Sequence, residues 1–240
     1  MNLVSVIIAS YNRFYYLLNA IKSIQEQTYK NIEIIVINDG SFQKEYTEYK
    51  FADNVTVLHR EVNSRSEFGY ANLGHIRNQG IKIAKGEYVA ILDDDDYWLP
   101  TKIEKQLDEM KKNNCWFSCT KAFIDTVDGG GIYNITKKYV PIYNYNHAMK
   151  LHFDIEINLK VGDIFFIKKE LCNKKFNSII CSSVLVKKDL LKKINWMDTD
   201  KPPAEDERTW IKLLKITNCV LINIPLLYYD VGHGDGHHWI

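Results

Sequence analysis

The first 112 residues alternate between continuous apolar runs and amphipathic stretches. The runs at 3–9, 31–39, 54–60 and 87–92 are rich in Val and Ile, which is typical of strands buried on both faces of a parallel sheet. Between the first two runs, Leu17, Ile21 and Ile24 recur at helical spacing after Asn12, which can cap the helix. This order predicts a βαβαβ beginning and a doubly wound sheet.

Two more helices are predicted around the fourth apolar run. In "LGHIRNQGIKIAKG" one helix face carries Leu73, Ile76, Gly80, Ile83 and Ala84, and Gly86 can end the helix. In "LPTKIEKQLDEMKKN" a Pro-Thr pair opens a helix in which Ile103, Leu107 and Met110 face inward. The first half therefore reads as an α/β unit.

The second half has a mixed pattern. It predicts a hairpin about residues 128–131, a strand at 178–188, helices at 189–194 and 205–216, and two short strands within 219–231. Residues 141–177 show no clear period, so we expect a long irregular segment there. No repeat or linker divides the chain, and we expect one α/β domain over residues 1–240.

Composition argues against several kinds of partner. Lys and Arg total 31 against 30 acidic residues, and the net charge of +1 argues against nucleic acid or an anionic membrane. The sequence shows no basic leader, and no apolar run approaches the ~20 residues of a transmembrane helix. We therefore expect a cytoplasmic protein, with peripheral membrane contact left open. Five scattered cysteines fit reduced thiols better than a disulfide framework or a zinc site.

Polar side chains follow three of the predicted parallel strands. They are "SYNR" at 10–13, "NDGS" at 38–41 and "DDDD" at 93–96, and ligands of open α/β sheets lie beyond such strand ends. Each motif alone also has a plain interpretation, as a helix start, a turn or a solvated acidic loop. Adjacent carboxylates repel by roughly 4 kcal/mol at a protein site, and a hard divalent cation would offset that repulsion.

Five segments resemble, in order and spacing, the GT-A fold glycosyltransferases of family 2. They are "VSVIIASYNR", "IEIIVINDGS", "RNQGIKIAKGEYVAILDDDDYWLPTKIEKQL", "CSSVLVKKDLL" and "EDERTWIKLL", within residues 3–230. Individually these motifs are weak, but five in register are specific. The resemblance implies a Rossmann-like, doubly wound, mostly parallel sheet with a smaller mixed acceptor-side part. It also implies a nucleotide-sugar-binding half at 1–112, and an acceptor-binding half with the C-terminal tail at 113–240.

The resemblance assigns residues to the donor nucleotide. It implies that Ala9, Tyr11 and Arg13 border the nucleotide, with the tyrosine stacked on the base. Asp39 would hydrogen-bond the base edge, as the matching aspartate does with uracil in the family, so a UDP-sugar is the expected donor. Arg77 matches a helix arginine that approaches the nucleotide, and the plain alternative is a surface arginine.

The acidic loop matches the family's Asp-x-Asp pair, which implies Mn²⁺ or Mg²⁺ as cofactor. Asp95 would ligate the cation, and Asp93 would reach the ribose or, through water, the metal. Asp94, counted with the nucleotide-sugar contacts, stands where the family usually has a small residue, which leaves open which aspartates form the pair. In the tail, His233 matches a histidine that some GT-A enzymes add to the metal, and a disordered terminus is the alternative.

Asp206 matches the second acid of the family's Glu-Asp motif and is the expected catalytic base. An acceptor hydroxyl has a pKa far above neutral, so it needs a carboxylate to take its proton as it attacks. The plain alternative is an acid that the macrodipole favours at a helix N-terminus. One base without a separate nucleophile predicts a single displacement with inversion at the anomeric carbon.

The sequence therefore predicts a metal-dependent inverting glycosyltransferase that moves one hexosyl or deoxyhexosyl group from a nucleoside diphosphate sugar. The acceptor would be a carbohydrate, a lipid-linked glycan or a protein. The sequence lacks the Gln-x-x-Arg-Trp motif and membrane helices of processive synthases, which favours transfer of a single sugar. Two alternatives stay open. One is a nucleotidyltransferase-like enzyme, although "ASYNR" is not a glycine-rich triphosphate loop, and the other is an inactive nucleotide-sugar-binding module.

Overall fold

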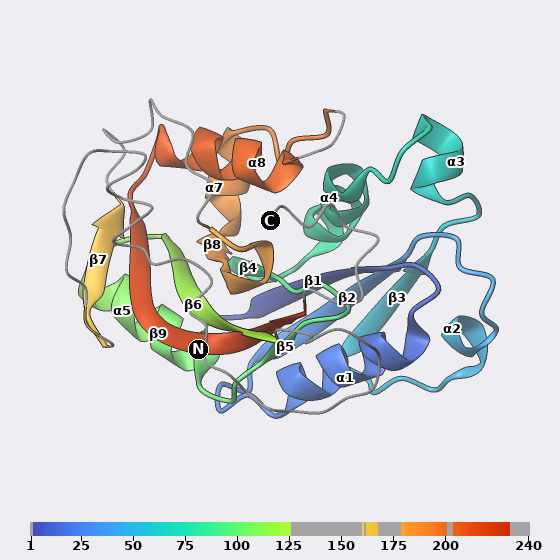
Figure 1. Ribbon diagram of the computed structural model, residues 1–240, viewed down its shortest axis with the longest axis horizontal. Helices are drawn as coiled ribbons and strands as arrows, with labels where there is room; N and C mark the ends of the chain where they lie inside the picture. The colour runs from blue at the N-terminus through green and yellow to red at the C-terminus, as the bar shows by residue number, and fades with distance from the viewer. Residues whose placement is uncertain (1, 126–159, 161, 168–178, 201–203, 231–240) are drawn as a thin grey trace.

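A computed structural model describes residues 2–125, 160, 162–167, 179–200 and 204–230 (Figure 1). Its strands are β1 (Val4–Ser10), β2 (Ile32–Asn38), β3 (Val55–His59), β4 (Tyr88–Ile91), β5 (Tyr97–Trp98), β6 (Phe117–Asp125), β7 (Ile164–Ile167), β8 (Leu185–Lys187) and β9 (Cys219–Asp230). Its helices are α1 (Phe14–Gln25), α2 (Glu45–Glu48), α3 (Ser64–Phe68), α4 (Leu73–Ile83), α5 (Lys102–Lys112), α7 (Lys188–Lys193) and α8 (Glu205–Leu214), with a 3-10 turn, η2, at Cys181–Ser183.

The described strands form one sheet in the order β3-β2-β1-β4-β8-β6-β9-β5, and β7 pairs with β9. Strands β3, β2, β1 and β4 run parallel, whereas β8 is antiparallel to both β4 and β6. Strands β6 and β9 are parallel again. The predicted α/β architecture, parallel in its first half and mixed in its second, is confirmed.

Helices cover both faces of this sheet (Figure 1). On one face, Ile76 of α4 and Trp210 of α8 belong to the same buried cluster as Ile35 of β2. On the other face, Leu17 of α1 and Ile103 of α5 share a second cluster with the opposite side chains of β1 and β2. Strands that are apolar on both faces require such double coverage, which explains the continuous apolar runs.

Asn12 does not cap α1, contrary to the prediction. The N-cap is Arg13, which makes no side-chain cap bond. Asn12 has a φ of 53°, a left-handed conformation that asparagine tolerates, and its side-chain oxygen accepts the Phe42 N–H at 3.0 Å. The side chain thus joins the turn after β1 to the turn after β2.

The predicted inward face of α4 is partly wrong. Ile76 is buried as expected, but Leu73 and Ile83 are 36% and 46% exposed, and Ile81 is buried in their place. The helix is therefore turned so that Arg77, next to Ile76, also lies inside, at 3% exposed.

Strand β9 replaces the two short strands predicted at the end of the described chain. Proline usually interrupts a ladder, but Pro225 lies opposite Lys121 at a register shift, where the missing N–H is tolerated. The strand therefore continues from Cys219 to Asp230 and reaches the end of the sheet that carries the acidic loop.

Two other predictions for the second half also need correction. The strand predicted at 178–188 is the turn η2 followed by the short β8. In η2, Ser183 Oγ donates to the Ile180 carbonyl at 2.7 Å, a local bond that competes with a strand ladder. The segment 141–177 is not wholly irregular, because Ile164–Ile167 forms β7. The hairpin predicted about residues 128–131 lies outside the described residues.

Lys102 of α5 is fully buried, which is rare for a lysine. Its Nζ donates to Gln106 Oε1 at 2.7 Å and lies 4.1 Å from the ring centroid of Trp98. Burial lowers the pKa of Lys102 well below its ordinary value, because desolvation disfavours the ammonium form. Below the ordinary lysine pKa the unfolded chain therefore binds more protons than the folded chain, and stability is lost as the pH falls.

We expect the stability difference between Lys102→Met and the wild type to change sign with pH. Below pH ~10 the wild type should lose free energy of unfolding relative to the variant by about 1.4 kcal/mol per pH unit, until the folded pKa is reached. At higher pH the variant should be the less stable chain, because it lacks the bond to Gln106. Chemical denaturation at about pH 7 and about pH 10 measures both values. The exposed Lys105→Met on the same helix is the control, and a pH-independent difference would contradict the prediction.

Candidate active site

The polar motifs that follow β1, β2 and β4 lie at one end of the sheet. Parallel pairing places Ser10 beside Asn38, so the residues that follow the two strands are neighbours. Hydrogen bonds join the motifs directly. Ser10 Oγ donates to Asp94 Oδ2 at 2.6 Å, and the Asn12 N–H donates to Ser41 Oγ at 2.9 Å. The structure therefore brings together the three motifs that the sequence placed at strand ends.

The acidic loop after β4 is folded into the protein. Asp94 and Asp96 are 5% and 1% exposed, and the side chains of Asp93 and Asp95 are 29% and 11% exposed. Arg13 Nη1 lies 2.8 Å from Asp95 Oδ2 and 3.5 Å from Asp94 Oδ1. The plain interpretation of four solvated aspartates is therefore wrong.

Asp96 joins this loop to β9. Its Oδ1 accepts the Asp230 N–H at 2.8 Å, and its Oδ2 is buried with no hydrogen-bond partner among the described residues. Burial raises the pKa of Asp96 well above its ordinary value, and the charges of Asp93 and Asp95 raise it further. Asp96 thus holds Asp230, the last residue of β9, against the acidic loop.

Burial and repulsion also raise the pKa values of two other loop carboxyls. Burial raises the pKa of Asp94 to about 7, and burial with the charge of Asp93 raises that of Asp95 to about 6. A cation would favour the ionised forms. Among the described residues, no three His, Cys, Asp or Glu side chains are grouped to hold a metal ion by themselves. The loop therefore fits Mg²⁺ or Mn²⁺ only in the mode that uses one or two carboxylates with substrate phosphates.

Arg77 of α4 joins the acidic loop to α8. Its Nη2 donates to Asp93 Oδ1 at 2.6 Å, and its Nη1 donates to Glu205 Oε1 at 3.2 Å. Burial alone lowers the pKa of Arg77, but Cys181, Asp93 and Glu205 together raise it well above its ordinary value. Arg77 is therefore a buried ionic bridge, and the alternative of a surface arginine is wrong.

Asp206 lies next to Glu205 in the first turn of α8. It keeps part of its surface in solvent, but the surrounding protein raises its pKa to about 6. Burial is the main cause and the charge of Glu205 the second, while Arg77 lowers the pKa. A carboxylate with a pKa near the working pH suits a general base.

Asp39 is buried, and donors from the segment after β3 already hold its carboxylate. The Ser64 N–H donates to Oδ1 at 2.9 Å, the Ser64 hydroxyl donates to Oδ2 at 2.7 Å, and Arg60 Nε lies 3.2 Å from Oδ1. Gly40 has a φ of 69°, and a Cβ there would lie 2.7 Å from the Asn63 nitrogen. The turn therefore packs tightly on residue 63. The Ser64 N–H also contacts Oδ2, at 3.1 Å, so four contacts match the roughly four hydrogen bonds that a carboxylate accepts, and a base-edge donor would have to share or replace one of them.

The other predicted nucleotide contacts lie at the end of β1. Ala9 is partly buried and packs against the core cluster that includes β2 and α4. Tyr11, just beyond the strand, is 40% exposed. His233 lies outside the described residues.

Sequence reasoning missed several residues that support this site. Ser182 accepts the Asp93 N–H through its Oγ at 3.0 Å. Burial raises the pKa of Tyr229, and the charges of Asp93 and Asp96 raise it further. Arg60 and Ser64 hold Asp39. The aromatic pair in "LLYYD" was the local signal for Tyr229, and Ser182 lies within the segment "CSSVLVKKDLL". No short motif marks Arg60 or Ser64.

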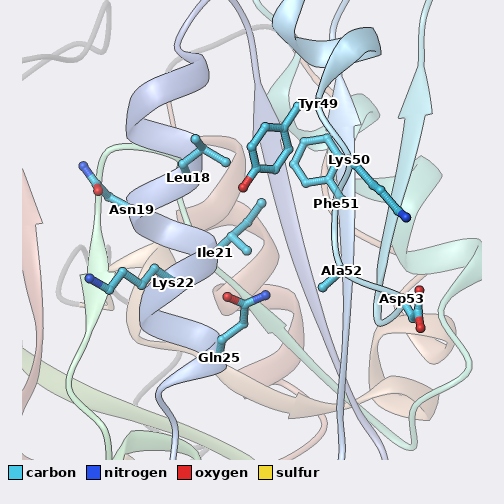
Figure 2. Close-up of a pocket in the computed structure, with 10 residues that line it drawn as sticks. All are labelled: Leu18, Asn19, Ile21, Lys22, Gln25, Tyr49, Lys50, Phe51, Ala52 and Asp53. Atoms are coloured by element: carbon cyan, nitrogen blue, oxygen red, sulfur yellow. The ribbon is translucent and has the colours of Figure 1, made fainter.

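A groove of about 650 Å³ lies elsewhere, between α1 and the segment that leads into β3 (Figure 2). It is lined by Leu18, Asn19, Ile21, Lys22, Gln25, Tyr49, Lys50, Phe51, Ala52 and Asp53. None of the predicted site residues is among them, so this groove is separate from the candidate active site.

Known proteins resemble the chain in sequence and in fold. A UDP-Glc:alpha-D-GlcNAc-diphosphoundecaprenol beta-1,3-glucosyltransferase, WfaP of Escherichia coli, is 29% identical over 98% of this chain and 79% of its own length. Glycosyltransferase GlyG of Streptococcus pneumoniae is 29% identical over 95% of this chain and 70% of its own. The crystal structure of S. aureus TarS 1-349 superposes with a TM-score of 0.68 at 19% identity, over 95% of this chain.

The likeness to TarS shows a GT-A fold, as the sequence resemblance implied. Within that fold the chain belongs to glycosyl transferase family 2, whose model matches residues 5–176. It is accordingly a glycosyltransferase. The chain spans 60% of the TarS 1-349 chain and 29% of a Rickettsia bellii relative. Among the described residues, no helix combines the length and apolar character needed to cross a bilayer.

Proposed function

We propose that the chain transfers one sugar from a UDP-sugar to an acceptor hydroxyl, by a single inverting displacement assisted by Mn²⁺ or Mg²⁺. The observation that supports this proposal is the bridge from Asp93 through Arg77 to Glu205, because it joins the acidic loop to the helix turn that carries the candidate base Asp206. WfaP is named for a UDP-Glc donor, and TarS has been crystallised with UDP and with UDP-GlcNAc, which supports a uridine nucleotide.

On the donor side, Tyr11 would stack on the base, Asp39 would accept a hydrogen bond from the base edge, and Ala9 and Arg13 would border the nucleotide. The guanidinium of Arg13 is already paired with Asp95, so its charge lies beside the carboxylate proposed to bind the cation. A cation held by Asp95, with Asp93 in support, would stabilise the charge on the departing diphosphate by several kcal/mol as a Lewis acid.

On the acceptor side, Asp206 would take the proton of the attacking hydroxyl. The hydroxyl oxygen forms a bond to the anomeric carbon while the bond from that carbon to the diphosphate oxygen breaks, and its electron pair leaves with UDP. Attack and departure occur on opposite faces, so the configuration inverts. A positioned general base typically contributes about 10²–10⁴-fold to such a step.

His233 would add a ligand to the cation or the diphosphate from the C-terminal tail. The support is its distance along the chain. Asp230 is bonded to Asp96 of the acidic loop, and His233 is three positions further on. Three residues span at most ~11 Å, so this spacing along the chain would allow His233 to reach the acidic loop.

The acceptor would be a carbohydrate, a lipid-linked glycan or a protein, and one hexosyl or deoxyhexosyl group would be transferred per reaction. The diphosphoundecaprenol acceptor in the name of WfaP supports the lipid-linked class. Membership of the glycosyl transferase family argues against the nucleotidyltransferase alternative. An inactive nucleotide-sugar-binding module is the alternative that the experiment below must separate.

Proton NMR of sugar release from UDP-glucose and UDP-N-acetylglucosamine, with water as acceptor, tests this function. We expect Mn²⁺-dependent release in which the first-formed free sugar is the β-anomer, because the donors are α-linked. A first-formed α-anomer would contradict inversion and the role of Asp206, and equal rates with Mn²⁺ and with a chelator would contradict metal assistance. Metal-dependent UDP binding without any turnover would favour the inactive module.

A further inference from the structure

We infer that Arg77 is a positioning residue, which holds the base-bearing turn of α8 at a fixed place relative to the acidic loop. This inference rests on the proposed function, in which Asp206 is the base. One guanidinium nitrogen is bonded to Asp93 at 2.6 Å and the other terminal nitrogen to Glu205 at 3.2 Å. The remaining Nε is buried and has no hydrogen-bond partner among the described residues. At 3% exposure, Arg77 has almost no surface left for a nucleotide.

The first turn of α8 needs the contact with Arg77, because the residues of the turn do not by themselves stabilise its conformation. The N-cap Ala204 has a φ of 74° and makes no side-chain cap bond. A left-handed conformation is unfavourable for a non-glycine residue, so the surrounding structure must impose it. Three acids, Glu205, Asp206 and Glu207, then follow in one turn. The charge of Glu205 raises the pKa of Asp206, so these two carboxylates repel each other.

Arg77 stands on a well-fixed helix. A Cβ at Gly74, on the preceding turn of α4, would lie 1.8 Å from the Asp198 carbonyl oxygen, so α4 packs directly on the segment before α8. Asn78 Nδ2 donates to the Met197 carbonyl at 2.9 Å, and the Met197 N–H donates to Asn78 Oδ1 at 2.9 Å. These contacts fix the distance between α4 and the segment 197–198 that precedes α8. The two bonds of the Arg77 guanidinium, called its fork below, fix the first turn of α8 itself.

The charges around Asp206 make this role measurable. Charged or titratable groups from five places interact with its carboxyl: Glu205 of α8, Arg77 of α4, Asp93 of the acidic loop, Cys181 of η2 and Tyr229 of β9. Arg77 is the cation of this set and lowers the pKa of Asp206. Removal of its charge should therefore raise that pKa, whereas replacement by another cation should preserve it.

The test compares Arg77→Lys and Arg77→Met with the wild type, using UDP release from UDP-glucose and UDP-N-acetylglucosamine with Mn²⁺. Arg77→Lys keeps the charge but loses the fork. We expect kcat to fall by about 10–100-fold through misplacement of the base, while the acid limb of the pH profile stays in place. The Kd for UDP should stay within about threefold, because the ground-state nucleotide contacts are retained. Arg77→Met should also move the acid limb to higher pH.

Arg208→Lys is the matched control, since Arg208 lies on the same helix and its Nε donates to Asp198 at 2.8 Å. It should leave kcat and the pH profile unchanged. Because loss of the buried guanidinium leaves Asp93 and Glu205 without their partner, Arg77→Met can fail to fold. Arg77→Lys then decides alone, with its unfolding midpoint measured alongside.

Three outcomes would overturn the inference. Wild-type kcat in Arg77→Lys would show that the fork does not position the base. A loss of UDP affinity of more than about tenfold with kcat retained would make Arg77 a nucleotide ligand. A wild-type chain that neither binds UDP nor releases it would refute the proposed function, and this inference with it, whereas the first two outcomes leave the proposed function intact.

Discussion

Replacement of Asp206 by asparagine should lower the kcat for sugar transfer or hydrolysis by about 10³-fold, while UDP still binds. Asparagine has nearly the same shape as aspartate but cannot take a proton from the acceptor hydroxyl, so the loss measures general base catalysis. Nucleotide affinity should change little, because Asp206 lies on α8 and the predicted base contacts lie beyond β1 and β2. Single-turnover UDP release and calorimetric titration with UDP measure the two quantities.

The same carboxyl should set the acid limb of the wild-type pH profile. Its pKa of about 6 means that activity falls as the pH drops through that value, because the protonated acid cannot act as a base. Glu207→Gln is the matched control, since it removes a charge from the same helix turn without removing the base. If Asp206→Asn and Glu207→Gln both changed only the stability, and by less than about 1 kcal/mol, Asp206 would be merely a helix-terminal acid.

The strands and strand-end motifs could be predicted because their signals are local. The runs at β1, β2 and β4 are apolar on both faces, which is typical of strands in the buried interior of a parallel sheet. Once the strands are parallel, their carboxyl ends must share one edge. The contact of Ser10 with Asp94, 84 positions apart, is consistent with that shared edge.

The supporting contacts could not be predicted, because they depend on how distant segments meet. Arg77 and Glu205 are 128 positions apart and belong to two different helices. No residue next to either of them in the sequence indicates that the two side chains pair. Asp39 and Ser64 are closer in sequence, but their contact depends on how the segment after β3 folds over Gly40. In β9, Pro225 suggested a break, and the register shift that accommodates it is visible only with β6 in place.

The acidic loop divides its four aspartates into two kinds. Asp94 bonds to Ser10 of β1, and Asp96 bonds to the backbone at the end of β9, so both act as internal anchors. Asp93 and Asp95 keep more exposed side chains and pair with Arg77 and Arg13. A cation that binds together with a diphosphate needs carboxylates that solvent can reach, which favours Asp95 and Asp93 over the two anchors.

Asp95→Asn should therefore weaken UDP binding in Mn²⁺ by at least about 100-fold, to the level measured with a chelator, because loss of a ligand costs no less than loss of its supporting contacts. Calorimetry and the Mn²⁺ electron paramagnetic resonance signal measure this loss. Asp94→Asn is the matched control and should leave the metal-dependent binding intact.

The pKa of Asp94 is raised to about 7, so between pH ~4 and 7 the folded wild type binds one more proton than the unfolded chain and loses stability as the pH rises. The asparagine variant should therefore gain relative stability across that interval. If Asp94→Asn instead removed the Mn²⁺ dependence and Asp95→Asn kept it, the metal-binding pair would be shifted by one residue along the loop.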